Sequence, residues 1–246
     1  MTLKYIITGT GRCGTVYVAR VLTDLGVYCG HEAIFDCHGV DFAIERINGR
    51  RPLKLSDASM MKFDGTHCSV IPEWLRDINE IVADSSYLAA PYLQLFDVGF
   101  VYLVRDPMKV VNSFCNYINY FKHPFPSDPY GMVYEEFVYK YVPELFQPMS
   151  QYERACLYYL RWNQMIEKNL EGKRFIFHRI EDDPQPILEF VGASGSASFT
   201  DTKINSFEKT GKTFNLSDIK NGTLKRDFID MGRRYGYPMA SENLLI

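Results

Sequence analysis

The chain has 246 residues, of which 46% are hydrophobic and 15% aromatic, enough to build the core of one large α/β domain. Its 27 basic and 30 acidic residues give a formal net charge of −3. Nucleic-acid binding draws on many Lys and Arg contacts to phosphate, so this balance argues against a nucleic-acid partner. Any anion site must be local.

The cysteines and the apolar runs indicate the compartment. The six cysteines are scattered, with no CxxC pair and without the density of a disulfide scaffold. The first apolar run, Leu3 to Thr8, is too short for a signal peptide or an anchor, and no later run is long enough to span a bilayer. Cysteine and histidine approach each other between Cys29 and His38, but their spacing matches no zinc pattern. We therefore expect a cytoplasmic protein with no membrane partner and no metal.

The chain opens with a predicted strand, a glycine-rich loop and a helix. Leu3 to Thr8 has the length and composition of a buried strand. After the loop, Val18, Val21, Leu22 and Leu25 follow at the spacing of one helix face. Together they make one β-loop-α unit.

Two further strands are predicted, each followed by a helix candidate. Ile78 to Ala83 ends at the polar residues 84–86. Val98 to Val104 is followed by Asp106, which can cap the next helix, and by Pro107, which suits its first turn. The later elements are a helix at Tyr152 to Leu170, a strand at Arg174 to Phe177, a helix at Pro186 to Val191 and a closing helix at Leu224 to Tyr235.

This alternation of strands and helices predicts the fold class. It is typical of an α/β three-layer sandwich with a central, mostly parallel sheet, right-handed crossovers and ligands at the carboxyl ends of the strands. The stretch from His123 to Pro148 is rich in prolines and aromatic residues, so we expect an irregular excursion that could serve as a lid over a site. We expect residues 1–246 to form a single domain.

The loop after the first strand has the composition of a phosphate cradle. Gly9, Gly11 and Gly14 let the backbone turn its N–H groups toward an anion, and the N-terminus of the next helix adds partial positive charge. The frame is that of a Walker A loop, but Thr15 stands where that motif requires Lys and Val16 where it requires Ser or Thr. These differences weaken an ATPase interpretation.

Two segments together resemble one known family. Arg12 lies within the loop, where a guanidinium suits bidentate contact with an oxyanion. The segment from Gly11 to Thr15 resembles the 5′-phosphosulfate loop of sulfotransferases that use 3′-phosphoadenosine-5′-phosphosulfate (PAPS). The segment from Tyr102 to Pro107, with Ser113 eight residues after Arg105, resembles the 3′-phosphate motif of the same family.

The resemblance implies a P-loop NTPase-like sulfotransferase fold and an enzyme that moves a sulfuryl group from PAPS to a hydroxyl acceptor, without a metal. Adenosine 3′,5′-bisphosphate would be the product. In the family, the residues that match Arg105 and Ser113 bind the 3′-phosphate. The implied nucleotide-binding residues are Gly11, Arg12, Cys13, Gly14, Thr15, Val16, Arg105 and Ser113.

Weaker resemblances extend over nearly the whole chain. They are Arg161 to Asn163, Phe177 to Asp182 and Tyr235 to Tyr237. Within them we expect Trp162 to pack in the core, and Glu181 and Asp182 to anchor a loop. Lys209 and Lys212 lie roughly where cytosolic family members place a basic flap over the nucleotide, but they could equally be solvated.

Sulfuryl transfer resembles phosphoryl transfer, so charge on the leaving phosphate must be stabilised and the acceptor hydroxyl must lose a proton. Arg12 is predicted to meet that charge. His31 and Glu32 are predicted to supply the base, and the sequence leaves open which of them takes the proton. They could instead be structural, with His31 capping a strand end and Glu32 solvated.

The strand end at residues 84–86 departs from the family pattern, because some branches have a lysine there. We expect Ser85 or Ser86 to donate a hydrogen bond to the sulfuryl oxygens and Asp84 to anchor the loop. This leaves Arg12 as the only evident cation at the transferred group.

Two other functions stay open at this stage. One is a P-loop kinase of a small metabolite, and the other is a non-catalytic family member that binds a nucleotide or a glycan. The acceptor could be a carbohydrate, a phenol or a small alcohol. The sequence does not predict the oligomeric state.

Overall fold

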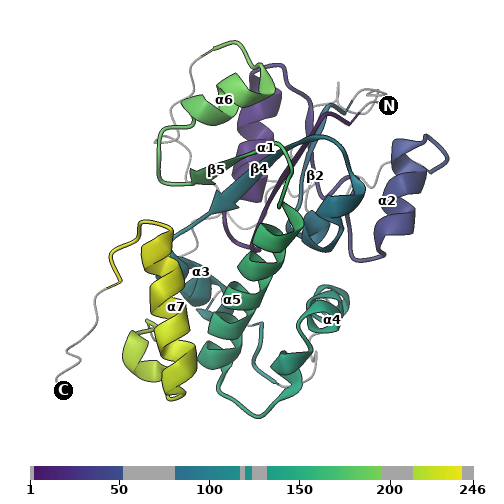
Figure 1. The fold of residues 1–246 in the computed structure, drawn as a ribbon. Helices are drawn as coiled ribbons and strands as arrows, with labels where there is room; N and C mark the ends of the chain where they lie inside the picture. The colour runs from purple at the N-terminus through teal and green to yellow at the C-terminus, as the bar shows by residue number, and fades with distance from the viewer. Residues whose placement is uncertain (1–2, 52–80, 117–119, 124–131, 196–212, 240–246) are drawn as a thin grey trace, which may run out of the picture. The chain divides into compact units, whose positions relative to one another are not determined.

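The computed structural model describes residues 3–51, 81–116, 120–123, 132–195 and 213–239 (Figure 1). The chain divides into two compact units. The first comprises Met1–Leu103 and Ile166–Ser206, and the second comprises Val104–Met165 and Phe207–Ile246. The sheet lies in the first unit, and the described part of the second is built of helices.

The first unit is organised around a five-stranded parallel sheet with the strand order β2-β3-β1-β4-β5. The strands are β1 (Tyr5–Gly9), β2 (Cys29–His31), β3 (Ala83–Ser85), β4 (Gly99–Val104) and β5 (Phe175–Arg179). Because all run in one direction, their carboxyl ends meet at a single edge. The α/β class with a parallel sheet is therefore confirmed.

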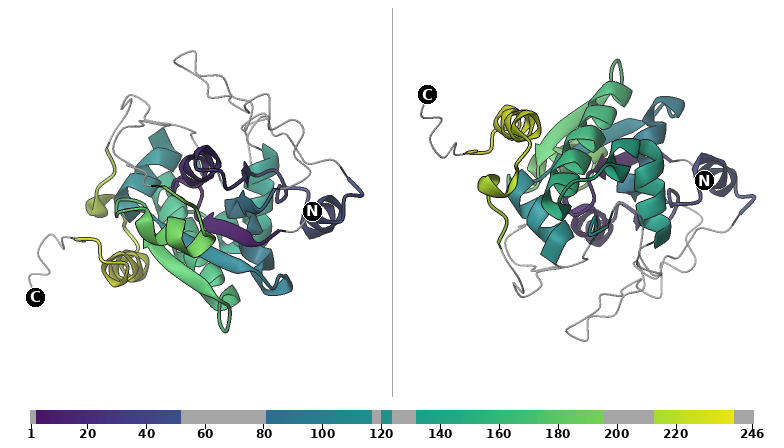
Figure 2. Two further views of the ribbon diagram at one scale, coloured as in Figure 1. Left: turned by 90° about the horizontal axis from the view of Figure 1, so that it is seen from above. Right: turned by 90° about the horizontal axis from the view of Figure 1, so that it is seen from below.

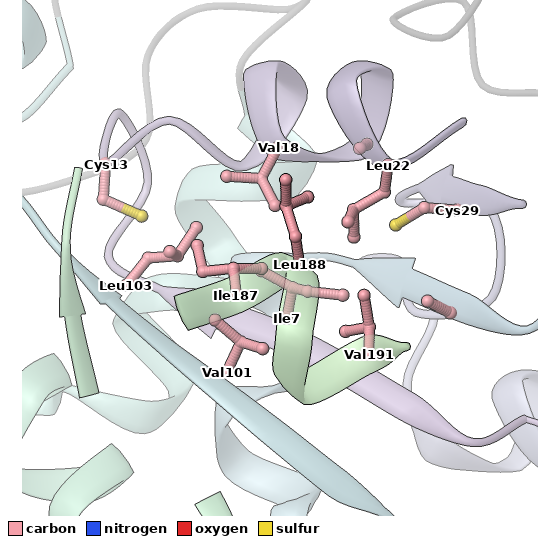
Figure 3. Close-up of a cluster of buried hydrophobic side chains, with 12 residues drawn as sticks. Ile7, Cys13, Val18, Leu22, Cys29, Val101, Leu103, Ile187, Leu188 and Val191 are labelled. Carbon is pink, nitrogen blue, oxygen red and sulfur yellow. The ribbon is translucent and has the colours of Figure 1, made fainter. Parts of the chain in front are cut away.

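Helices α1 (Thr15–Asp24) and α6 (Gln185–Val191) lie on one side of this sheet (Figures 1 and 2). Apolar side chains from the two helices and from alternate strand positions form one buried cluster there (Figure 3). Its labelled members include Ile7, Val101 and Leu103 from the strands, Val18 and Leu22 from α1, and Ile187, Leu188 and Val191 from α6. Each such side chain contributes about 1.5–3 kcal/mol when fully buried, so this cluster fixes α1 and the loop before it on the sheet.

The remaining elements of the first unit lie along the chain between β2 and β4. They are α2 (Val40–Ile47) and a 3₁₀ segment, η2 (Tyr87–Leu95). Ser86 caps η2, because its hydroxyl oxygen accepts the N–H of Leu88 at 3.1 Å.

The predicted strand at Ile78 to Ala83 is misplaced. The strand β3 begins at Ala83 and includes Asp84 and Ser85, whereas residues 78–80 lie outside the described part of the chain. Asp84 and Ser85 pair with Ile6 and Ile7 of β1. Two polar residues can occupy a buried strand because their side chains find hydrogen-bond partners, which the local pattern could not reveal.

The remaining helices are α3 (Pro107–Asn116), α4 (Met132–Tyr141), η3 (Pro143–Phe146), α5 (Gln151–Asn169), η4 (Leu216–Asp218) and α7 (Gly222–Arg234). The predicted cap of α3 is confirmed, since the carboxylate of Asp106 accepts the N–H groups of Met108 and Lys109 at 2.8 and 3.4 Å. None of the helices in the described ranges is long and apolar enough to cross a bilayer.

The expectation of an irregular excursion from His123 to Pro148 is wrong for its second half. Residues 132–146 form α4 and η3, and Phe137, Val138 and Leu145 bury their side chains there. Their burial favours helix despite the many aromatic residues and the nearby prolines. Residues 124–131 lie outside the described part of the chain, so a lid there stays a prediction.

The core of the second unit contains a cluster of aromatic rings. Phe114, Phe121 and Tyr158 have ring centroids 5.1–5.3 Å apart, and Trp162 lies 5.2 Å from Tyr158. The prediction that Trp162 packs in the core is confirmed, since its side chain is fully buried. Phe121 has a φ of 64°, and its N–H donates to the buried carboxylate of Glu135 at 2.9 Å.

Candidate functional site

The carboxyl edge of the sheet in the first unit gathers most of the predicted site. The glycine loop follows β1, His31 is the last residue of β2, and Glu32 comes directly after it. His31 pairs with Ser85 of β3, which in turn pairs with Ile7 of β1. The parallel register therefore brings the loop and the His31–Glu32 pair to the same edge of the sheet, at two strand ends with only β3 between them.

The predicted loop residues are divided between the loop and the first turn of α1. Gly11, Arg12, Cys13 and Gly14 form the loop, and Thr15 and Val16 begin the helix. Gly14 has a φ of 103°, and a Cβ added there would lie 2.7 Å from Cγ1 of Ile180. Both the conformation and the close approach therefore require glycine at this position.

The N-terminus of α1 is suited to an anion. Gly14 occupies the N-cap position and offers no side-chain oxygen to the first turn of the helix. The first N–H groups of a helix point outward along its axis and carry partial positive charge. An anionic group could take the place of a side-chain cap at this point.

His31 contacts the start of α1. Its Nε2 lies 3.3 Å from Oγ1 of Thr15 and 3.9 Å from Oε1 of Glu32. Burial, and secondly the positive charge of Arg12, lower the pKa of His31 to about 4. The imidazole is therefore neutral at pH 7, and its coupling to Arg12 links the loop electrostatically to the pair.

Glu32 is buried, with 6% of its surface exposed, so the alternative in which it is solvated is wrong. Its φ is 52°, and that of Arg12 is 68°. A residue other than glycine in this left-handed region costs about 1–3 kcal/mol and persists only where its surroundings hold it. Two of the three predicted catalytic residues are thus held in a strained backbone conformation, which motivates the hypothesis of a functional role for them.

The turn after Glu32 is held by Asp84. One oxygen of the Asp84 carboxylate accepts the N–H of Ala33 at 3.1 Å. The other accepts the N–H groups of Ile34 and Phe35 at 3.3 and 3.1 Å. Burial raises the pKa of Asp84 to about 6, although these three donors and the nearby Arg46 act in the opposite direction.

Arg46 and Asp36 complete this buried network, and the sequence did not single them out. The guanidinium of Arg46, on α2, donates to the carbonyl oxygen of Ile34 at 2.7 Å and to Oδ2 of Asp36 at 2.8 Å. Both side chains are buried, and each compensates the charge of the other, which would be costly to bury without a partner. Only the amphipathic pattern of α2, with an arginine on its apolar face, could have pointed to them.

The two serines that follow Asp84 hold the main chain. The hydroxyl of Ser85 donates to the carbonyl oxygen of Thr15 at 2.9 Å, and that of Ser86 donates to the carbonyl oxygen of Phe35 at 3.1 Å. Each serine therefore ties β3 to one half of the site, the helix start or the turn after Glu32. Donation of either hydroxyl to a sulfuryl group stays a prediction.

Arg105 and Ser113 lie in the second unit. Arg105 follows β4 directly, and its carbonyl oxygen accepts the hydroxyl of Tyr159 at 3.1 Å. Ser113 is in the second turn of α3 and is buried, with 5% of its surface exposed. The strand end and the helix that carry the two residues thus form a second β-loop-α unit, as predicted.

The weaker resemblances are mainly structural. Asp182 anchors the turn after β5, because its two oxygens accept from the guanidinium of Arg179 at 2.8 and 2.7 Å. These hydrogen bonds lower the pKa of Asp182. Lys209 and Lys212 lie outside the described residues.

No group of three or more His, Cys, Asp and Glu side chains in the described ranges is arranged to hold a metal ion. No protein-family model matches the chain, and no curated protein matches it. Its function must therefore be inferred from the geometry of the site.

Proposed function

We propose that the protein is a PAPS-dependent sulfotransferase with a three-layer, P-loop NTPase-like fold. The observation that carries this proposal is the contact between Thr15 and His31, at 3.3 Å, which joins the anion cradle to the His31–Glu32 pair. A transferase to a hydroxyl needs an anion site and a proton acceptor side by side. The five described cysteines are thiols, which fits the reducing cytoplasm that we propose as its compartment.

The residues of the loop fit a phosphosulfate group. Gly14 gives the loop the positive φ of 103° with which it enters α1, and the start of α1 supplies N–H groups and partial charge. The guanidinium of Arg12 would bind the sulfuryl or bridging oxygens in a bidentate manner. Arg105 and Ser113 would recognise the 3′-phosphate that distinguishes PAPS from ATP.

The proposed reaction is a direct displacement at sulfur. The acceptor oxygen forms a new S–O bond while the S–O bond to the bridging phosphate oxygen breaks, and the electron pair of that bond leaves with adenosine 3′,5′-bisphosphate. Arg12 stabilises the charge that grows on the bridging oxygen. The proton of the acceptor hydroxyl passes to the His31–Glu32 pair.

The pair contains two groups that are able to take this proton. Because its pKa is lowered to about 4, His31 is neutral at pH 7 and can accept a proton, although it is a weaker base than an ordinary imidazole. Glu32 is buried 3.9 Å from Nε2 of His31 and could act as the base itself or orient the imidazole. The acceptor would be a carbohydrate, a phenol or a small alcohol.

Calorimetry and a transfer assay test the proposal. The protein should bind adenosine 3′,5′-bisphosphate more tightly than ATP, and it should transfer radioactive sulfate from labelled PAPS to a member of a panel of sugars, phenols and aliphatic alcohols. Binding of ATP with transfer of its γ-phosphate would favour a kinase. Bisphosphate binding without transfer to any acceptor would indicate a non-catalytic binding protein.

A further inference from the structure

We propose that Asp84 is a positioning residue for the acid–base pair: from β3 it holds the turn that follows Glu32 and thereby fixes His31 and Glu32 at the edge of the sheet. The role of the pair comes from the proposed function, whereas the contacts of Asp84 do not depend on it.

The hydrogen bonds from residues 33–35 to the Asp84 carboxylate, here called the clamp, act on three consecutive peptide groups. Asp84 accepts the N–H groups of residues 33–35, each about 50 positions away along the chain. Three hydrogen bonds to successive N–H groups fix the backbone directly after Glu32, which has a φ of 52°. Because that conformation is strained, it needs an external restraint of this kind.

Two further side chains hold the carbonyl groups of the same turn. Ser86 donates to the carbonyl oxygen of Phe35 at 3.1 Å, and Arg46 donates to that of Ile34 at 2.7 Å. Arg46 also pairs with Asp36 at the end of the turn. The N–H and carbonyl groups of the turn therefore have hydrogen-bond partners on two sides, on or next to β3 and on α2. These bonds leave the turn little freedom to move as a unit.

Gly30 makes room for the clamp. A Cβ at this position would lie 2.6 Å from Oδ1 of Asp84 and 2.6 Å from Cβ of Ala33. A side chain here would push the carboxylate away from the turn. The glycine directly before His31 is thus explained by the close approach of Asp84 and Ala33 rather than by its own backbone conformation.

Burial of the Asp84 carboxyl group has a cost in stability at neutral pH, which the three hydrogen bonds from residues 33–35 reduce. Burial raises the pKa of Asp84 to about 6, above its ordinary value of 3.8. A carboxyl group whose pKa is raised by folding stabilises the fold when it is protonated, and this contribution is lost as the pH rises through about 6. At neutral pH the protein therefore keeps a carboxylate that reduces its own stability, as is common at functional sites.

The test follows the pKa of His31 by NMR in Asp84→Asn and Gly30→Ala, with the imidazoles isotopically labelled. In Asp84→Asn an amide nitrogen, which cannot accept a hydrogen bond, faces the N–H of Ala33, so the turn should open. The ring of His31 should then become hydrated, and its pKa should rise from about 4 toward 6.5. Loss of a negative charge cannot by itself raise this pKa, since it would disfavour the imidazolium. Gly30→Ala should give the same rise with every charge retained, including those of Arg12, Glu32 and Asp84.

Glu153→Gln is the matched control, because Glu153 is a buried carboxylate that also accepts several main-chain N–H groups, in the second unit. It should lower stability and leave the pKa of His31 unchanged. Exchange of the amide hydrogens of residues 33–35 should accelerate in Asp84→Asn and in Gly30→Ala, but not in the control. If one of the two variants does not fold, the other carries the test.

An unchanged pKa of His31 in the folded variants, with unchanged amide exchange at residues 33–35, would overturn the proposal. With an acceptor that the wild type uses, kcat should fall about 100-fold in both variants, as expected for misplaced reacting groups, while the Kd of adenosine 3′,5′-bisphosphate stays the same. Absence of any transfer by the wild type would count against the proposed function alone, because the NMR measurements need no ligand.

Discussion

Oγ1 of Thr15 lies 3.3 Å from Nε2 of His31, and this contact connects the first residue of α1 with the last residue of β2. Thr15 directly follows the glycine loop, and His31 directly precedes Glu32. An anion bound by the loop and a proton taken by the pair would therefore be separated by only a few atoms. The neutral state of His31 at pH 7, which burial and Arg12 enforce, allows the ring to accept a hydrogen bond or a proton from this side.

Replacing Thr15 with valine removes one of the two groups in this contact. Thr15 is also a predicted nucleotide-binding residue. Thr15→Val should therefore weaken binding of adenosine 3′,5′-bisphosphate by about 0.5–1.5 kcal/mol, the usual contribution of one neutral hydrogen bond from the hydroxyl to the nucleotide. Loss of the contact with Nε2 should also alter the pKa of His31. Calorimetry and NMR measure the two effects. Thr23→Val on the same helix is the control, because its hydroxyl bonds only to the main chain of Cys29 among the contacts described, and it should change stability alone.

Replacing Arg12 separates binding from catalysis. Arg12→Ala should weaken bisphosphate binding but lower kcat more strongly, by about 100- to 1000-fold, because the guanidinium acts on charge that grows in the transition state. It should also raise the pKa of His31, since Arg12 contributes to lowering it. Arg20→Ala, which removes an exposed ion pair with Asp24 on α1, should change none of these quantities. Weaker binding with an unchanged kcat would mean that Arg12 binds the nucleotide only.

Much of the first unit could be predicted from the sequence because its signals are local. The apolar run before the glycine loop predicted β1 to within two residues, the helical pattern after the loop predicted that a helix follows, and Asp106 followed by Pro107 gave the start of α3. An anchoring role of Asp84 could be anticipated, because a buried carboxylate must find donors, but the sequence did not show that these donors are the N–H groups of residues 33–35.

The parts that could not be predicted depend on contacts between distant residues. Asp84 and Ser85 can belong to the buried strand β3 because their side chains form hydrogen bonds with residues far away along the chain. Asp84 bonds to residues 33–35 and Ser85 bonds to Thr15. The ion pair of Arg46 with Asp36 likewise needs α2 to be folded against the turn. The helix α4 was missed because burial of its aromatic side chains outweighs a local composition typical of loops.

Recognition of the 3′-phosphate is tested at Arg105. The wild type should bind adenosine 3′,5′-bisphosphate far more tightly than adenosine 5′-monophosphate, and Arg105→Ala should remove most of this difference, about 1.5–3 kcal/mol for a charge-assisted pair. Lys109 is an exposed residue on α3, and Lys109→Ala serves as the control for loss of positive charge. Unchanged bisphosphate affinity in Arg105→Ala would remove the residue from the binding site.

Glu153 should stabilise the second unit. Burial alone would raise its pKa, but hydrogen bonds from Ser150, Asn221 and Lys220 outweigh burial and lower it. The stabilisation is therefore present above the ordinary glutamate pKa, about 4.3, and is lost as the pH falls through the lower value in the folded state. Glu153→Gln should reduce the free energy of unfolding by about 1–3 kcal/mol at pH 7, measured by urea denaturation, and the difference should shrink in acid. A difference that is independent of pH would contradict the assignment.

The acid–base pair is tested with His31→Ala and Glu32→Gln made separately. If either residue removes the acceptor proton, its replacement should abolish transfer to an aliphatic alcohol and leave bisphosphate affinity nearly unchanged, since the base acts on the acceptor. A phenol acceptor should be affected less, because its pKa of about 10 makes deprotonation easier.

The pH dependence of kcat/KM distinguishes the two residues. The wild-type rate should fall in acid as the base becomes protonated, near pH 4 if the base is His31, whose pKa is lowered to about 4 by burial and by Arg12. If Glu32 is the base, His31→Ala should retain measurable transfer and still lose it in acid, because the carboxylate titrates without the ring. If the imidazole is the base, Glu32→Gln should keep the acid limb, shifted downward, since the loss of a carboxylate 3.9 Å from Nε2 disfavours the imidazolium. Near-wild-type rates in both variants on every acceptor would place the base elsewhere, and loss of nucleotide binding in either variant would indicate that the pair holds the loop in place.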